Sequence, residues 1–110
     1  MACIHTLADN VLGWAKERGI LANSTAQKQM LKLVSEMGEL SDNLAKGRDV
    51  KDDIGDCLVV LTIIAHLSGT SLKESFDTAW QDIKDRKGYL NDSGVFIKES
   101  DASQQPELAL

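Results

Sequence analysis

The sequence predicts an all-α fold, a bundle of four to five helices completed by dimerisation or tetramerisation, with a short non-helical C-terminal arm. Apolar residues recur at steps of three and four along most of the chain, which is the period of a helix with one buried face. Glycines and capping residues separate these stretches, and the single proline, Pro106, lies near the end. A chain of 110 residues fits one domain but leaves little room for a deep pocket, so subunits would share a site.

The first two predicted helices cover residues 4–18 and 26–46. Gly19 ends the first helix, because glycine readily takes the left-handed conformation at a helix C-terminus. Ser or Thr at position 24 or 25 provides an N-cap for the second helix, and Gly47 ends it. The core-facing stripe of this second helix comprises Met30, Leu33, Val34, Met37, Leu40 and Leu44.

The third and fourth predicted helices cover residues 49–67 and residues 71–88. The middle of the third could also be a buried strand by periodicity, but its unbroken length favours a central helix. Ser71 with Glu74 matches a capping box at the start of the fourth helix, which should end near Gly88. After it we expect a hairpin or extended arm that completes a domain of residues 1–98, and then a flexible tail over residues 99–110.

Composition excludes several classes of function. The net charge of −5 argues against nucleic-acid binding, which usually draws on clustered Lys and Arg. Cys3 and Cys57 form no disulfide framework and the N-terminus shows no secretory signal, so we expect a cytoplasmic protein. Residues 57–65, apolar except for Thr62, are too short to span a membrane, and no membrane association is expected.

Two pairs of acidic residues stand on neighbouring predicted helices. Glu36 and Glu39 lie on one and Asp53 and Asp56 on the next, and the spacing of three puts each pair on one helix face. The short connection around Gly47 makes the two helices antiparallel neighbours. Because the pairs lie at similar distances from that connection, the four carboxylates can meet at one level.

Such convergence is unfavourable unless something neutralises it. Like charges at this spacing cost about 0.2–0.5 kcal/mol even on an exposed helix. Mg²⁺ prefers oxygen ligands and is commonly shared with substrate phosphates, so it would remove the conflict. Gly38 and Gly55, next to the acids, would allow close helix approach or leave room for a ligand. The alternative is that the acids are solvated and partly serve a helix N-terminus.

At these residues the sequence resembles a known family. Residues 35–40 (Ser-Glu-Met-Gly-Glu-Leu) and 53–61 (Asp-Ile-Gly-Asp-Cys-Leu-Val-Val-Leu) resemble the MazG-like branch of the all-α nucleoside triphosphate pyrophosphohydrolases, in its short single-domain form found in phages and bacteria. The family pattern is Glu-Glu-x-x-Glu, a spacer, and then Glu-x-x-Asp. The likeness covers about residues 10–98. Ser35 stands where the first Glu often occurs, Asp53 replaces a Glu, and Gln81 replaces an Asn.

The resemblance implies a hydrolase that converts (d)NTP and water to (d)NMP and pyrophosphate, as a homodimer or homotetramer. It implies Mg²⁺ as cofactor, with Mn²⁺ as a substitute, and the host cytoplasm as location if a phage encodes the chain. The implied metal ligands are Glu36, Glu39, Asp53 and Asp56. We expect Glu36 or Glu39 to be catalytic as well, by orienting the attacking water and accepting its proton.

Six further residues are candidates for binding the nucleotide, each with an ordinary structural alternative. The basic residues could neutralise the triphosphate, or could form ion pairs and suit a helix C-terminus. The tryptophan could stack on a base or pack in the core. These candidates are Lys32, Trp14, Gln81, Lys84, Arg86 and Lys98.

Three rival functions stay open. The scaffold could be a non-catalytic nucleotide or metal sensor, which would bind a dNTP without turnover. It could be a helical interaction module, for which Mg²⁺ would give no thermal shift. It could also hydrolyse phosphoribosyl-ATP, a reaction that belongs to the same superfamily.

Overall fold

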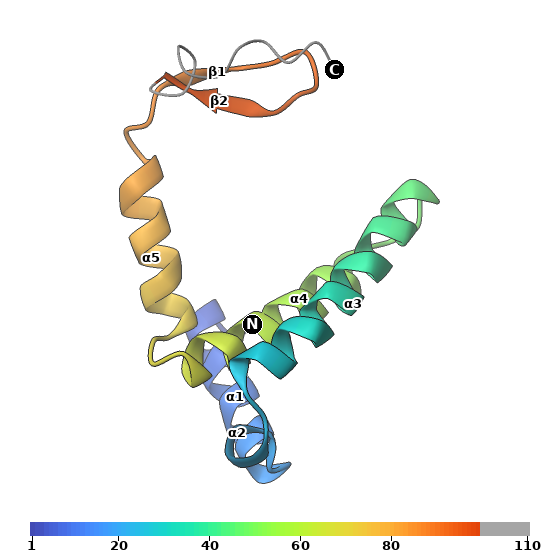
Figure 1. Cartoon of the computed structure of the whole chain (residues 1–110), viewed down its shortest axis with the longest axis vertical. Coiled ribbons are helices and arrows are strands. Elements are labelled where there is room, and N and C mark those ends of the chain that lie inside the picture. Colours follow the sequence, from blue (N-terminus) through green and yellow to red (C-terminus); the bar gives the residue numbers. More distant parts are fainter. Residues whose placement is uncertain (100–110) are drawn as a thin grey trace. The chain divides into compact units, whose positions relative to one another are not determined.

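The computed structural model describes residues 1–99, which form five helices and one two-stranded hairpin (Figure 1). The all-α prediction and the non-helical arm are confirmed. The described chain divides into a compact unit over Met1–Phe76 and a second that begins at Asp77, and each is treated by itself below. Of the predicted tail, residues 100–110 lie outside the described residues, and the domain boundary at residue 98 stays a prediction.

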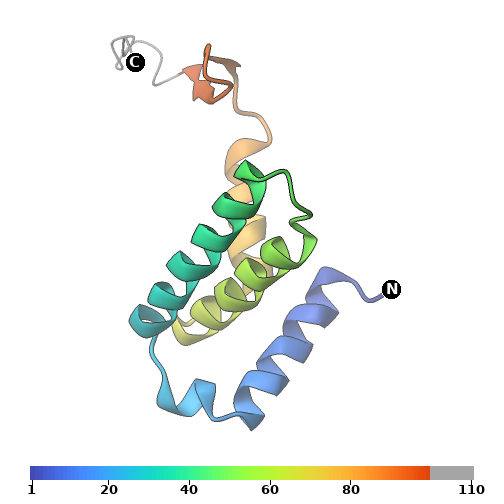
Figure 2. The same cartoon turned by 90° about the vertical axis from the view of Figure 1, so that its right-hand side faces the viewer.

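The first unit is built around a central helix. This helix, α4 (Lys51–Leu67), lies between α1 (Ile4–Glu17) and α3 (Ala26–Ala45), as Figure 2 shows. The most extensive packing is between α3 and α4, which run antiparallel, as the short connection predicted. A one-turn helix that the sequence analysis did not predict, α2 (Ile20–Asn23), joins α1 to α3.

The helix ends are set by local chemistry that the sequence displays. Gly19 and Gly47 take φ angles of 74° and 67°, a conformation that costs glycine little. The Thr25 hydroxyl accepts a hydrogen bond of 3.1 Å from the backbone N–H of Lys28 and caps α3. These contacts explain why the predicted bounds of α1 and α3 are correct to within one residue.

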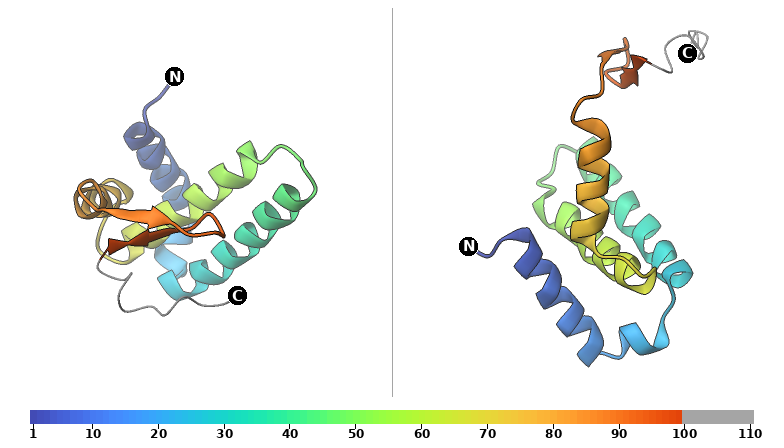
Figure 3. Two further views of the ribbon diagram at one scale, coloured as in Figure 1. Left: turned by 90° about the horizontal axis from the view of Figure 1, so that it is seen from above. Right: turned by 90° about the vertical axis from the view of Figure 1, so that its left-hand side faces the viewer.

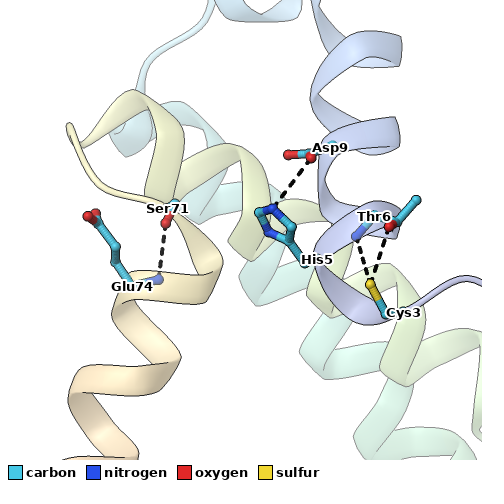
Figure 4. A network of polar contacts seen from close by, with 6 residues as sticks. All are labelled: Cys3, His5, Thr6, Asp9, Ser71 and Glu74. Carbon is cyan, nitrogen blue, oxygen red and sulfur yellow. Dashed lines mark hydrogen bonds and ion pairs between the residues drawn. The ribbon is translucent and has the colours of Figure 1, made fainter.

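The starts of α1 and α5 (Leu72–Ile83) are also capped (Figure 4). The sulfur of Cys3 accepts the backbone N–H of Thr6 at 3.4 Å. The Ser71 hydroxyl accepts the backbone N–H of Glu74 at 3.0 Å, which is one half of the predicted capping box. The carboxylate of Glu74 instead accepts a hydrogen bond from the Thr70 hydroxyl at 3.1 Å.

The prediction that the fourth helix ends near Gly88 was wrong. Helix α5, whose first turn belongs to the first unit, ends at Ile83, and Gly88 begins strand β1 (Gly88–Leu90). This strand pairs antiparallel with β2 (Phe96–Lys98), and Figure 3 shows the resulting hairpin. A Cβ at Gly88 would lie 2.0 Å from the carbonyl oxygen of Ile97, so the glycine serves strand pairing and not a helix end.

The apolar core of the described residues is small. Five apolar residues are buried, namely Ala15, Leu33, Val60, Ile63 and Ala65. Many large apolar side chains on α3, α4 and α5 are exposed to solvent instead. Within residues 1–99 no single helix is long and apolar enough to cross a membrane, and only α4 and α5 taken together, a bent pair, reach the required length and composition.

Candidate functional site

Two of the predicted acids are among the most buried residues of the chain. Glu36 on α3 and Asp53 on α4 are 7% and 9% exposed, whereas Leu31, also on α3, is 74% exposed. This reverses the ordinary order, in which carboxylates stay in water unless they are paired. The burial follows from the sequence, since Glu36 lies three residues after Leu33 on the side of α3 that packs against α4.

The carboxylate of Glu36 is only half satisfied. Its Oε1 lies 2.9 Å from the ammonium Nζ of Lys32, one turn earlier on α3. Its Oε2 is buried and has no hydrogen-bond partner. A buried carboxylate oxygen without a donor costs free energy, and such an atom in a folded protein calls for an explanation, such as an ion that binds there.

Asp53 is held by a residue that the sequence analysis missed. The side-chain amide of Asn43 on α3 donates a hydrogen bond of 3.0 Å to Oδ2 of Asp53 on α4. Asn43 follows Glu36 by seven residues, two helical turns, so it lies on the same face of α3. That spacing was the available signal, but asparagine is too common on helix surfaces for it to be specific.

The other two acids, Glu39 and Asp56, interact with the buried acids through their charges. The negative charge of Glu36 raises the pKa of Glu39, and loss of solvation adds to this. Loss of solvation between the helices raises the pKa of Asp56, and the charges of Asp52 and Glu36 raise it further. The charges of Glu36 and Asp53 act on both Glu39 and Asp56, so acids of α3 and α4 interact electrostatically across the helix pair.

The cluster has the chemistry of a divalent cation site, although its side chains are not gathered around one point. Among residues 1–99, no three Asp, Glu, His or Cys side chains are placed so that they could hold a metal ion as they stand. Lys32 and Asn43 occupy Glu36 and Asp53 instead. The all-oxygen donor set and the unpartnered Oε2 of Glu36 nevertheless suit Mg²⁺. A bound cation would also relieve the repulsion among the four carboxylates.

Gly38 and Gly55 do not serve close packing of α3 on α4. A Cβ at either position would meet nothing within 4 Å, so that part of the prediction is wrong for the single chain. The other predicted role, room for a ligand, stays open. Gly55 lines a groove between α1 and α4, which is where such room exists.

This groove, which we call the α1–α4 groove, has a volume of about 650 Å³ and is mostly apolar. Its walls include Trp14 and Asn10 of α1 and Asp56 of α4, so one of the four acids borders it. The guanidinium of Arg18 lies 5.8 Å from the centre of the Trp14 ring. Trp14 is half-exposed in the groove and is not a core residue.

Comparison with known proteins identifies the family. The family model described as the MazG nucleotide pyrophosphohydrolase domain matches residues 24–90, more than half of the chain. The chain belongs to this family. The matched region contains all four acids together with Lys32 and Asn43, whereas α1 and its Trp14 lie outside it.

A curated relative comes from a bacteriophage. An uncharacterized 18.2 kDa protein of Haemophilus phage HP1 (strain HP1c1), described as lying in the rep-hol intergenic region, is 45% identical over 67 residues. The match covers 59% of the present chain and 41% of the phage protein, so the chain spans about two fifths of that relative's length. No solved structure matches the chain.

MazG-family enzymes generally depend on a divalent metal. Family membership alone does not place the predicted phosphate-binding residues of the second unit. There, Gln81 donates to Asp77 at 3.4 Å, and Arg86 pairs with Asp82. Lys84 directly follows α5, and Lys98 is the last residue of β2. A role for these four residues in substrate binding stays a prediction.

Proposed function

We propose that the protein is an Mg²⁺-dependent nucleoside triphosphate pyrophosphohydrolase that converts (d)NTP and water to (d)NMP and pyrophosphate. One observation above all supports this proposal. Glu36 is buried in a cluster of four acids, with one carboxylate oxygen left without a partner. A cation that neutralises these acids would also attract the phosphates of a nucleotide, since a divalent ion can bridge two sets of negative charge.

The metal would be held by Glu36, Glu39, Asp53 and Asp56. Bound Mg²⁺ supplies Lewis-acid polarisation of the phosphate and activation of water. Either Glu36 or Glu39 would orient the attacking water and accept its proton, because a carboxylate within hydrogen-bond reach of the water can act as a general base.

In the proposed reaction the water oxygen forms a bond to the α-phosphorus, and the bond from that phosphorus to the bridging oxygen breaks. Pyrophosphate leaves with the electron pair, and the proton of the water passes to Glu36 or Glu39. Lys32, which is largely exposed and lies beside the cluster, can contact a phosphate. Lys84, Arg86 and Lys98, with Gln81, are proposed to contact the leaving pyrophosphate.

The α1–α4 groove is the proposed place for the base. It borders Asp56, so a nucleotide whose phosphates lie at the cluster could extend its base into the groove. Trp14 offers a flat apolar surface for stacking, and Asn10 offers an amide for hydrogen bonds to a base edge.

The proposal is tested by measuring pyrophosphate release from a panel of dNTPs and NTPs, with Mg²⁺ and with EDTA. We expect Mg²⁺-dependent release of one pyrophosphate per nucleotide, with no release in EDTA. Glu36→Gln should lower kcat by at least about a hundredfold, the scale of removing one charged group from a preorganised site.

Asp42→Asn is the matched control, because Asp42 lies on the same helix but is exposed and paired with Lys46. It should retain full activity. Tight nucleotide binding without turnover would replace the proposal with a sensor function. Turnover of phosphoribosyl-ATP alone would change the substrate class, and the absence of any Mg²⁺-dependent product would refute the hydrolase.

A further inference from the structure

The ammonium of Lys32 occupies the one partnered oxygen of the buried Glu36 carboxylate. The distance is 2.9 Å, and the Lys32 side chain is 61% exposed while that of Glu36 is 9% exposed. The lysine therefore reaches in from solvent to a carboxylate that is itself buried. The pair joins an exposed cation to a buried anion.

The surroundings of Lys32 are otherwise negative. The charges of Glu39 and Asp56 act on it together with that of Glu36. No other ion pair between Lys or Arg and one of the four acids occurs in the part of the chain that the structure describes. Lys32 thus supplies the nearest balancing charge for the cluster in the metal-free protein.

We propose that Lys32 is the resident counter-ion of the acidic cluster, which competes with the divalent cation for Glu36 and is displaced from it when the cation binds. This inference rests on the metal site of the proposed function and deepens it. A cation that reaches Glu36 must take over an oxygen that Lys32 now holds, and two like charges at such close range repel. Lys32 therefore lowers the affinity for the free metal.

The displaced Lys32 ammonium could then contact the substrate, because Lys32 lies one helical turn before Glu36 and stays close to the cluster. A triphosphate that arrives with the metal offers it new oxygens, so the loss of the Glu36 contact is compensated only when substrate is present. In the metal-free protein, Lys32 thereby reduces the repulsion among the four acids. The affinity for the metal is then highest when a nucleotide is also bound.

The test is the affinity of the intact chain for Mn²⁺ alone, followed by the paramagnetic signal of free Mn²⁺. Lys32→Met should bind Mn²⁺ roughly five- to tenfold more tightly than the wild type, the Coulombic effect expected for a solvent-screened charge a few ångström from the ion. Lys32→Arg, which keeps the charge, should bind as weakly as the wild type.

Lys28→Met is the matched control. Lys28 lies one turn earlier on the same exposed side of α3 and forms no ion pair within residues 1–99, so its loss should change the affinity less than twofold. Because Lys32→Met leaves Glu36 unpaired, its metal-free melting temperature should fall, and Mg²⁺ should raise it by more than it raises the wild type.

The outcomes separate the two proposals. Mn²⁺ binding by the wild type with equal or weaker binding by Lys32→Met would overturn the role of Lys32 and leave the metal site standing. An equal gain in Lys28→Met would reduce the effect to general surface charge and overturn it as well. If the wild type bound no Mn²⁺ at all, the proposed function would fail and this inference with it.

Discussion

At the scale of single residues, the sequence identified the four acids of the site but not the residues that hydrogen-bond to them. The four carboxylates could be identified from their spacing, because helical geometry alone places them on two facing surfaces. Asn43 could not, since nothing in the sequence says which polar neighbour will reach Asp53 across the helix pair. The same holds for the orphaned oxygen of Glu36, which depends on the rotamer and the packing of the side chain.

Asn43 offers a test of how Asp53 is positioned. Asp53 is one methylene shorter than the Glu of the family pattern, so its orientation matters for reaching a metal, and the amide of Asn43 fixes one of its oxygens. We expect Asn43→Ala to lower Mg²⁺ affinity by about ten- to a hundredfold, the usual effect of removing a group that orients a ligand. Isothermal titration calorimetry measures this directly.

The exposed neighbour Ser41 provides the control, since Ser41→Ala removes a polar group from the same helix without touching Asp53. Circular dichroism should show both variants to be as helical as the wild type. An unchanged affinity in Asn43→Ala would mean that Asp53 reaches the metal without help, or is not a ligand.

At the scale of the helices, prediction succeeded where local chemistry decides the outcome. The bounds of α1 and α3 depend on glycine conformation and an N-cap hydroxyl, which the sequence displays. Prediction failed at α2 and at the end of α5. Helix α5 ends at Ile83, five residues before Gly88, and Gly88 pairs with Lys98 of β2, a partner ten residues away that the helical pattern around Gly88 does not indicate.

The open space at Gly55 leads to a prediction in which stability and binding change in opposite directions. Alanine would meet nothing within 4 Å in the folded chain and is the better helix former, so Gly55→Ala should raise stability by about 0.5–1 kcal/mol. The added methyl group would project at the α1–α4 groove and should raise KM for the nucleotide. Thermal melts and steady-state kinetics measure the two effects.

Gly13, on the same unit and also without a neighbour within 4 Å, gives the comparison, because it lies on α1 and is not a groove residue. Gly13→Ala should stabilise the protein and leave KM unchanged. Equal kinetics for both variants would remove the groove from the substrate site.

The raised pKa values of Glu39 and Asp56 predict how the pair of α3 and α4 responds to pH. A carboxyl whose pKa is raised on folding binds more protons in the folded than in the unfolded state. Its ionisation therefore costs the fold free energy above the raised pKa, and this cost disappears as the pH falls toward the ordinary carboxyl value. The metal-free protein should thus melt at a higher temperature near about pH 5.5 than near about pH 7.5.

Melting curves in EDTA measure this, with the double variant Glu39→Gln/Asp56→Asn as the control. That variant lacks both groups and should show a smaller gain on acidification. Saturating Mg²⁺ should reverse the trend in the wild type, because the ionised acids then bind the cation. A wild type and a double variant that respond identically to pH would show that the two carboxyls carry no such penalty.

At the scale of the whole molecule, the distribution of apolar residues is the feature that most needs explaining. Five apolar residues are buried in the described chain, while each of three helices exposes an apolar stripe. On α3 the stripe contains Met30, Val34, Met37 and Leu44, and on α4 it contains Ile54, Leu58 and Leu61. Faces of this kind are covered in a folded protein either by another part of the chain or by another subunit.

We propose that a second copy of the chain covers the α3 stripe, in line with the homodimer or homotetramer expected from the sequence. Val34, 57% exposed, provides the test. In a monomer, Val34→Glu would change an exposed position and should alter stability by no more than about 0.5 kcal/mol. In a dimer the same change buries a charge at the interface, so it should lower both the molecular mass in solution and the melting temperature.

Light scattering after size exclusion should therefore give the wild type at least twice the chain mass of 12.0 kDa, and Val34→Glu a smaller mass. Lys28→Glu places a carboxylate on the same helix at an exposed position away from the stripe and should leave the assembly intact. A wild type of single-chain mass, with Val34→Glu strongly destabilised, would mean that another part of the same chain covers the stripe. A monomeric wild type indifferent to the change would mean that this face is open. Because the proposed metal ligands lie on the same two helices as these stripes, loss of the proposed dimer should also weaken the response to Mg²⁺.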